Sequence, residues 1–193
     1  SLRPAEERTV PSMLFSDPPV HNRLRKLVSH AFKPAHIESQ RDLISDRCET
    51  LVKNMSASSQ PDLVNSLAAP LPVTVIAHML GVPESNNVQF KHWSDTIFSN
   101  IGDILMATPS KEVEVAAAEM DSYFLDRIAI LRKHPEDHLL GRLIETETED
   151  GHLSNEELLS FCRLLLIAGN ETTTGLITGI VRVFSDQPET FDA

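Results

Sequence analysis

A long apolar run from Asn155 to Ser185 constrains the fold of this chain more than any other feature. It follows a Ser-x-x-Glu motif at Ser154 and Glu157, which is a helix capping box, and it ends before Pro188. A helix of this length, rising about 1.5 Å per residue, crosses most of a small domain. We therefore expect an all-α fold organised around one long buried helix at about 155–185.

The other segments also favour helices. Apolar residues recur at helical spacing from Leu24 to Ala31, and Asp17 before two prolines is the expected N-cap of that helix. Proline- and glycine-containing turns separate the remaining periodic segments. We expect further helices over 35–55, 64–79 (in part), 88–101, 111–133 and 139–145, followed by an acidic turn at 146–151.

The charge balance argues against a nucleic-acid partner. The 193 residues carry 17 Lys and Arg against 28 Asp and Glu, a formal charge of −11. Nucleic-acid binders usually present a basic face. Residues 1–60 hold nine basic and seven acidic side chains, whereas 61–193 hold eight and twenty-one. Any basic patch is therefore expected in the first third.

The two cysteines, Cys48 and Cys162, lie far apart and have no second Cys or His at metal-ligand spacing. Neither a disulfide framework nor a zinc site is indicated. The start of the chain shows no secretion signal, and the apolar stretch 164–169 is too short to span a bilayer. We expect a cytoplasmic protein with no membrane contact.

A polar segment interrupts the long apolar run. Residues 168–175 read Ala-Gly-Asn-Glu-Thr-Thr-Thr-Gly, and most of these residue types are poor helix formers. We expect the Thr172 hydroxyl to bond the Ala168 carbonyl, and a buried Glu171 beside it suggests proton delivery in a dry pocket. The alternative is a packing site, with Gly175 and Gly179 admitting a neighbouring helix.

A second candidate site lies on the helix after Asp17. His21 and Arg25 are one turn apart at the border of the apolar stripe, whereas Arg23 and Lys26 are expected to point away from it. Two cationic donors beside apolar surface suit the carboxylate or phosphate of a mostly hydrophobic ligand. The alternative is that His21 and Arg25 pair with nearby Glu side chains.

Five segments of the sequence, in this order and spacing, resemble the cytochrome P450 family of the soluble bacterial class. The resemblance covers nearly the whole chain and corresponds to the central helical part of that fold. The segments are 15–28 (Phe-Ser-Asp-Pro-Pro-Val-His-Asn-Arg-Leu-Arg-Lys-Leu-Val), 31–34 (Ala-Phe-Lys-Pro), 70–76 (Pro-Leu-Pro-Val-Thr-Val-Ile), 80–83 (Leu-Gly-Val-Pro) and 164–174 (Leu-Leu-Leu-Ile-Ala-Gly-Asn-Glu-Thr-Thr-Thr).

The resemblance implies a haem cofactor. His21 and Arg25 would hold the haem propionates, and Ala168 and Gly169 would lie against the porphyrin on the side where oxygen and substrate bind. The implied activity is monooxygenation of a small apolar organic substrate.

The resemblance also implies catalytic and partner roles. Glu171 and Thr172 would be the acid-alcohol pair that organises water and relays protons during dioxygen reduction. Arg23 and Lys26 would fall on the face that receives an electron donor, a ferredoxin or flavodoxin-like protein.

The sequence departs from the family in two places. The N-terminal sheet region and the C-terminal region with the Glu-x-x-Arg helix and the iron-ligating Cys loop are absent, and Glu38-x-x-Arg41 precedes the long helix instead of following it. Without the axial thiolate we expect a fragment that is inactive alone, holds no haem stably and self-associates through exposed apolar helices.

Other classes are weighed against this one. The main alternative is a non-enzymatic all-α module, derived from the same family, that binds a ligand or partner. No metal ligands are expected, because His-Glu-x-x-His is absent and the one Glu-x-x-His, at Glu149 and His152, falls in the acidic turn.

Overall fold

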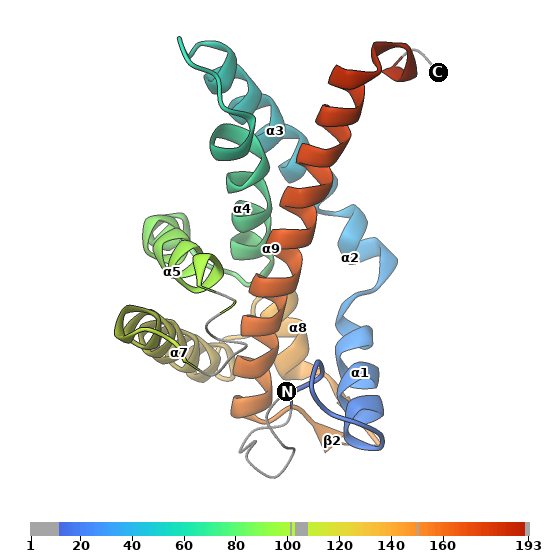
Figure 1. The fold of residues 1–193 in the computed structure, drawn as a ribbon. Helices are drawn as coiled ribbons and strands as arrows, with labels where there is room; N and C mark the ends of the chain where they lie inside the picture. The colour runs from blue at the N-terminus through green and yellow to red at the C-terminus, as the bar shows by residue number, and fades with distance from the viewer. Residues whose placement is uncertain (1–11, 101, 103–107, 150, 192–193) are drawn as a thin grey trace.

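A single long helix, α9 (Asn155–Asp186), runs through the molecule, and shorter helices pack along it (Figure 1). The computed structural model describes residues 12–100, 102, 108–149 and 151–191. In this part of the chain the elements before α9 are α1 (Val20–Ala31), α2 (Pro34–Glu38), α3 (Arg41–Ser56), the π-helix η2 (Val64–Ala68), α4 (Pro70–Met79), the 3₁₀ turn η3 (Glu84–Asn86), α5 (Asn87–Ser99), α7 (Lys111–Leu131), α8 (Leu139–Glu145) and the strands β1 (Glu147–Thr148) and β2 (Gly151–His152); the 3₁₀ turn η4 (Pro188–Phe191) follows α9.

The capping box starts α9 as expected. The Ser154 hydroxyl accepts from the Glu157 amide at 3.2 Å, and the Glu157 carboxylate accepts from the Ser154 amide at 2.8 Å. From Leu158 to Asn170 one face of α9 is buried. From Glu171 onward it is largely exposed, because η2, α4 and η4 are the described elements that contact this half. The expected burial therefore holds for the first half of α9.

The core lies where α5, α7 and α8 meet the first half of α9. Phe90 of α5 and Phe124 of α7 are each 1% exposed and pack edge to face at 6.3 Å. Leu140 of α8 and Leu158 of α9 are fully buried in the same cluster. Each large apolar side chain removed from water contributes roughly 1.5–3 kcal/mol, so this region holds the bundle together.

Two helix boundaries differ from the sequence prediction. Asp17 is not the N-cap of α1: the helix begins at Val20 after Pro19, and Asp17 contributes its backbone carbonyl, which accepts from the His21 amide at 3.1 Å. The helix expected over 35–55 is two helices, α2 and α3. Ser39 closes α2, because its amide bonds the Ala35 carbonyl and its hydroxyl bonds the His36 carbonyl.

The acidic turn contains a short hairpin, in which β1 and β2 pair antiparallel before the chain enters α9. The helices expected over 111–133 and 139–145 are confirmed as α7 and α8. The helix expected over 88–101 is α5, which ends at Ser99. The expected lack of a secretion signal concerns residues 1–4, which lie outside the described residues.

By length and hydropathy alone, α9 is the one helix in the described ranges that is able to cross a membrane. Core helices of soluble proteins meet the same two criteria. Only 11% of the apolar window of α9 is buried in the described fold, so packing of its first half against other helices accounts for part of its apolar character.

Candidate functional site

The polar segment of α9 contains the predicted hydrogen bond between Thr172 and Ala168. Thr172 Oγ1 donates to the Ala168 carbonyl at 2.6 Å. Ala168, Glu171 and Thr172 are all exposed, so the expectation of a buried Glu171 is wrong for the described fold. The physical reason is that no described element covers this side of α9. Together the three residues place a methyl group, a carboxylate and a hydroxyl on the exposed side of an otherwise apolar helix.

Asn170 and Thr174 were not among the predicted site residues, and they form the buried side of the same segment. Asn170 is only 4% exposed. Thr174 Oγ1 lies 3.0 Å from the Ala68 carbonyl of η2 and 3.4 Å from Asn170 Oδ1. Their spacing after the buried Leu166, at i+4 and i+8, is the sequence signal that places them on the packed face.

Gly169 allows α4 to approach α9 closely. A Cβ atom at Gly169 would stand 3.0 Å from Ile76 Cδ1. Gly175 and Gly179, by contrast, have open space where a Cβ would be, so no described helix uses them for packing. The packing alternative for this segment therefore applies at Gly169, and the role of Gly169 against a porphyrin stays a prediction.

The predicted anion site on α1 presents its two side chains outward. Arg25 is exposed and His21 is half-buried, and His21 Nδ1 lies 3.4 Å from Asn22 Oδ1. No Glu side chain in the described ranges pairs with His21 or Arg25, contrary to the alternative considered for them. The role of His21 and Arg25 in binding an anion stays a prediction.

Arg23 does not point away from the protein as predicted. Its Nη1 donates to Glu157 Oε1 at 2.7 Å, and its Nη2 donates to the His152 carbonyl at 2.8 Å. The Glu157 side chain is 9% exposed and the Arg23 side chain 32%, so this is a part-buried ion pair between α1 and the start of α9. Lys26 is exposed, as expected.

Neither cysteine is suited to bind iron. Burial raises the pKa of the Cys162 thiol to about 12, and the side chain lies in the core against its neighbours on α9. Burial also raises the pKa of Cys48, on α3. A thiol held protonated is a poor metal ligand, because the thiolate is the binding form.

The other residues present do fit a haem in part. His21 and Arg25 supply donors for two carboxylates, and Ala168 offers a small exposed side chain next to which a flat ring can lie. The chemistry of these side chains is thus compatible with propionates and one porphyrin face, and their role in holding haem stays a prediction.

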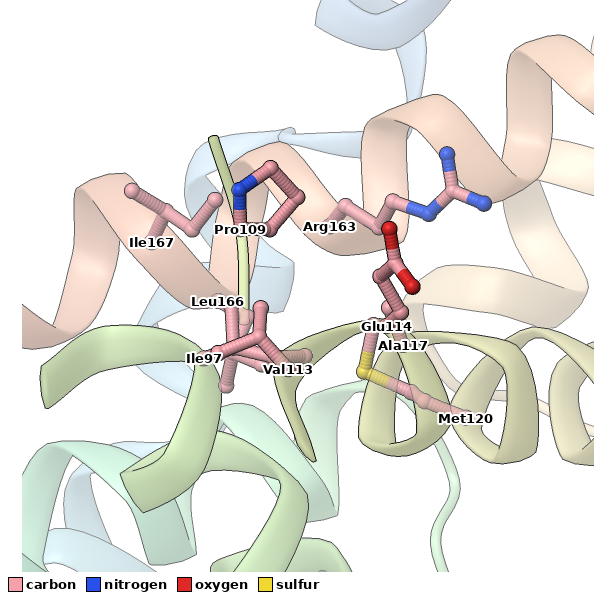
Figure 2. A pocket seen from close by; sticks show the side chains of 9 residues that line it. All are labelled: Ile97, Pro109, Val113, Glu114, Ala117, Met120, Arg163, Leu166 and Ile167. Atoms are coloured by element: carbon pink, nitrogen blue, oxygen red, sulfur yellow. The ribbon is translucent and has the colours of Figure 1, made fainter. Parts of the chain in front are cut away.

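A cavity of about 280 Å³ lies between α5, α7 and α9 (Figure 2). Arg163, at its edge, donates to Asp121 of α7 at 2.7 Å and is thereby neutralised. Arg163 and Thr172 are nine residues apart and so on opposite faces of α9. The lining residues are mainly apolar: Ile97, Pro109, Val113, Glu114, Ala117, Met120, Arg163, Leu166 and Ile167.

The described part of the chain is an all-α assembly around one long central helix. On that helix a Thr hydroxyl bonds a carbonyl one turn back, and a separate helix carries the cationic pair His21 and Arg25. No protein-family model matches the chain. It is 37% identical over 191 residues to the cytochrome P450 monooxygenase PikC of Streptomyces venezuelae, covering 97% of the chain and 44% of PikC. It is also 37% identical over 184 residues to a methyl-branched lipid omega-hydroxylase of Mycobacterium bovis, covering 94% of the chain and 43% of that protein.

Solved structures agree with these relatives. The substrate-free structure of CYP109E1 from Bacillus megaterium superposes with a TM-score of 0.87 at 34% identity, over 98% of the chain and 51% of that structure. The ligand-free cytochrome P450 TbtJ1 gives a TM-score of 0.84 at 35% identity. The chain is therefore a homologue of the cytochrome P450s and has the helical part of their fold. It spans about half the length of the curated relatives it matches.

Proposed function

We propose that this chain is the helical portion of a haem-dependent monooxygenase that oxidises a small apolar organic molecule with dioxygen. The observation that best supports this is the 2.6 Å hydrogen bond from Thr172 to the Ala168 carbonyl, on the long helix shared with the P450 relatives. Such a bond uses the hydroxyl proton of Thr172 and leaves its oxygen able to accept from water.

His21 and Arg25 would hold the haem propionates, and Ala168 and Gly169 would lie against the porphyrin. The chemistry that a bound haem supplies is the reductive activation of dioxygen. Arg25 has a fixed charge at any physiological pH, whereas His21 contributes a full charge only when protonated. Arg25 is thus the constant part of the proposed propionate site.

Glu171 and Thr172 would move protons in this reaction. Thr172 donates its own hydroxyl proton to Ala168, so its oxygen is oriented to accept a proton-bearing water. Glu171 is exposed on the next position of the same helix, where its carboxylate can exchange protons with solvent. The pair would therefore connect bulk water to the face of α9 that carries Ala168.

An electron donor is required, and we place its contact on α1. Lys26 is exposed there within the basic first third of the chain, which suits an acidic ferredoxin or flavodoxin-like protein. We exclude Arg23 from the contact with the electron donor, because Glu157 neutralises its charge. We place the enzyme in the cytoplasm, where such donors and bacterial P450 relatives work.

The mainly apolar cavity between α5, α7 and α9 lies against the face of α9 opposite Thr172, so it does not support the proposed substrate site.

One experiment tests the placement of the iron ligand. Haem, dithionite and carbon monoxide are added to the purified chain, and the absorption spectrum is recorded. We expect no Soret band of a thiolate-ligated haem, because Cys162 is buried in the core on α9 and Cys48 lies within α3, and neither is in a Gly-rich loop. A thiolate band would overturn our assignment of the axial ligand to a region outside this chain.

A second observation separates the enzyme from a non-enzymatic ligand- or partner-binding module. The coding sequence that follows Ala193 is determined. A Phe-x-x-Gly loop with a Cys would supply the thiolate and support the monooxygenase. A stop codon would contradict it and favour the binding module, for which Glu171→Gln and Thr172→Ala would leave function unchanged.

A further inference from the structure

The side chains on the two sides of the buried stripe of α1 have different contacts. This stripe is formed by Leu24, Leu27, Val28 and Ala31. At 100° per residue, Arg23 lies on one side of this stripe, and His21 and Arg25 lie together on the other. A rotation of α1 about its axis therefore moves the Arg23 edge and the His21–Arg25 edge together.

Apolar contacts alone do not fix that rotation. Leu24 and Val28 pack on Leu153 and Phe161 at the start of α9, with a residual cavity of only about 10 Å³. Such contacts are close but non-directional. Hydrogen bonds to a charged group are directional, so the ion pair of Arg23 is the contact that can set the angle.

Glu157 makes the contacts that are needed to fix the rotation of α1. Its Oε1 accepts from Arg23 Nη1 at 2.7 Å, and its Oε2 accepts from the Ser154 amide at 2.8 Å and from Arg23 Nη2 at 3.4 Å. The same Arg23 Nη2 reaches the His152 carbonyl at 2.8 Å, in the hairpin. One nearly buried carboxylate thus joins α1, the hairpin and the first turn of α9.

We propose that Glu157 is a positioning residue: through Arg23 it fixes the rotation of α1 and thereby the direction in which His21 and Arg25 face an anionic ligand. This inference rests on the proposed function, which makes that ligand the propionate pair of haem. Glu157 lies fourteen residues before Glu171 and touches none of the proposed catalytic groups, so it acts through Arg23 alone.

The test compares binding of hemin with binding of hemin dimethyl ester, whose propionates carry no charge. Titrations of the purified 193-residue chain follow quenching of Trp93 fluorescence and haem absorbance. We expect the wild type to favour hemin by roughly two- to tenfold, the range of two exposed charge contacts. Arg25→Gln removes one of those contacts and is expected to lose most of the preference.

Glu157→Gln is the informative variant. A Gln oxygen can still accept from the Ser154 amide, but its NH₂ group meets Arg23 Nη1, so the helix start is kept and the 2.7 Å bond to Arg23 is lost. The preference for hemin should fall toward that of Arg25→Gln with unchanged helicity. The double variant should match Arg25→Gln alone, because both changes act on one contact. Arg23→Lys, which keeps a positive charge opposite Glu157, should retain part of the preference for hemin.

Ser154→Ala is the matched control. It removes the 3.2 Å bond from the Glu157 amide to the Ser154 hydroxyl but leaves the Arg23–Glu157 pair in place. It should weaken the helix start and leave the preference for hemin unchanged. A loss equal to that of Glu157→Gln would mean that Glu157 has only a capping role, and would overturn the proposal.

Hydrogen exchange decides the remaining case, in which the wild type does not distinguish hemin from its ester. That result contradicts the propionate site, and the positioning role is then judged on α1 itself. Glu157→Gln should raise amide exchange in α1 relative to α5, and Ser154→Ala should not. If Glu157→Gln changes neither α1 exchange nor ligand preference, the proposal is wrong.

Discussion

The imidazole of His138 lies directly against Gly81, so close that a Cβ atom at position 81 would stand 2.2 Å from His138 Nε2. Gly81 follows α4 with φ of +70°, and His138 is the N-cap of α8. Arg127 of α7 donates to the Gly81 carbonyl at 3.3 Å. This contact therefore joins the end of α4 to α7 and α8, two consecutive helices that follow much later in the chain.

Gly81→Ala should destabilise the chain strongly. The left-handed backbone costs an alanine about 1–2 kcal/mol, and displacing a packed ring costs about 1–3 kcal/mol more. Urea unfolding followed by circular dichroism measures the loss. Gly151→Ala is the control, since Gly151 also has positive φ, at +87°, but faces open space. Equal losses in the two variants would mean that the His138 contact contributes nothing.

Acid should weaken the same region through His138. Burial lowers the pKa of His138, an effect reinforced by Arg127 and Arg142 and opposed by Glu136. Its Nδ1 accepts from the Gly141 amide at 3.1 Å, which only the neutral ring can do. The folded pKa lies below the ordinary 6.5, so this contribution to stability is complete above 6.5 and is lost as pH falls from there through the folded pKa.

The free energy of unfolding, measured at several values between about pH 5 and pH 8, should show this loss. His138→Asn is the matched control, because Asn is a good N-cap that does not titrate. The variant should lose less stability than the wild type over the same range. Identical pH profiles would exclude His138 as the source.

The two thiols should differ in reactivity. Cys162 is buried with a pKa of about 12, whereas Cys48 is partly exposed on α3. A thiol reagent such as DTNB should label one cysteine per native chain and both in urea. Cys48→Ser should abolish labelling of the native chain. Rapid native labelling of Cys162 would contradict the packing of α9 described here.

Sequence periodicity predicted the helices well and their surroundings less well. The capping box at Ser154 and the Thr172–Ala168 bond are local, and both were correct because each depends on residues within one or two turns. The pairing of Arg23 with Glu157 depends on residues 134 positions apart, and a helical projection of α1 alone has no information about that partner. The exposure of Glu171 was not predicted for the same reason, because an amphipathic pattern shows which face of a helix is apolar but not which element packs against each face.

Thr174→Val should cost about 1–2 kcal/mol of stability. The hydroxyl of Thr174 serves the Ala68 carbonyl, and its removal leaves a buried acceptor without a partner. Thr178→Val is the control, since the Thr178 hydroxyl bonds carbonyls of its own helix. Thermal unfolding should show a larger decrease in Tm for Thr174→Val. A similar effect of both variants would mean that the η2–α9 contact is not stabilising.

The exposed half of α9 should cause the purified chain to self-associate. Leu176, Ile180 and Val183 are 61%, 45% and 51% exposed and follow one another at helical spacing beside Gly175 and Gly179, which leave room for another helix. Soluble monomers rarely expose a contiguous apolar surface of this kind, and burying it at roughly 25 cal/mol per Å² favours association.

Light scattering over a range of concentrations should give a mass above 21.5 kDa. The double variant Leu176→Glu with Ile180→Glu should shift the chain to monomer, whereas Val88→Glu, which alters an isolated exposed residue on α5, should not. A monodisperse monomer in the wild type would contradict the prediction.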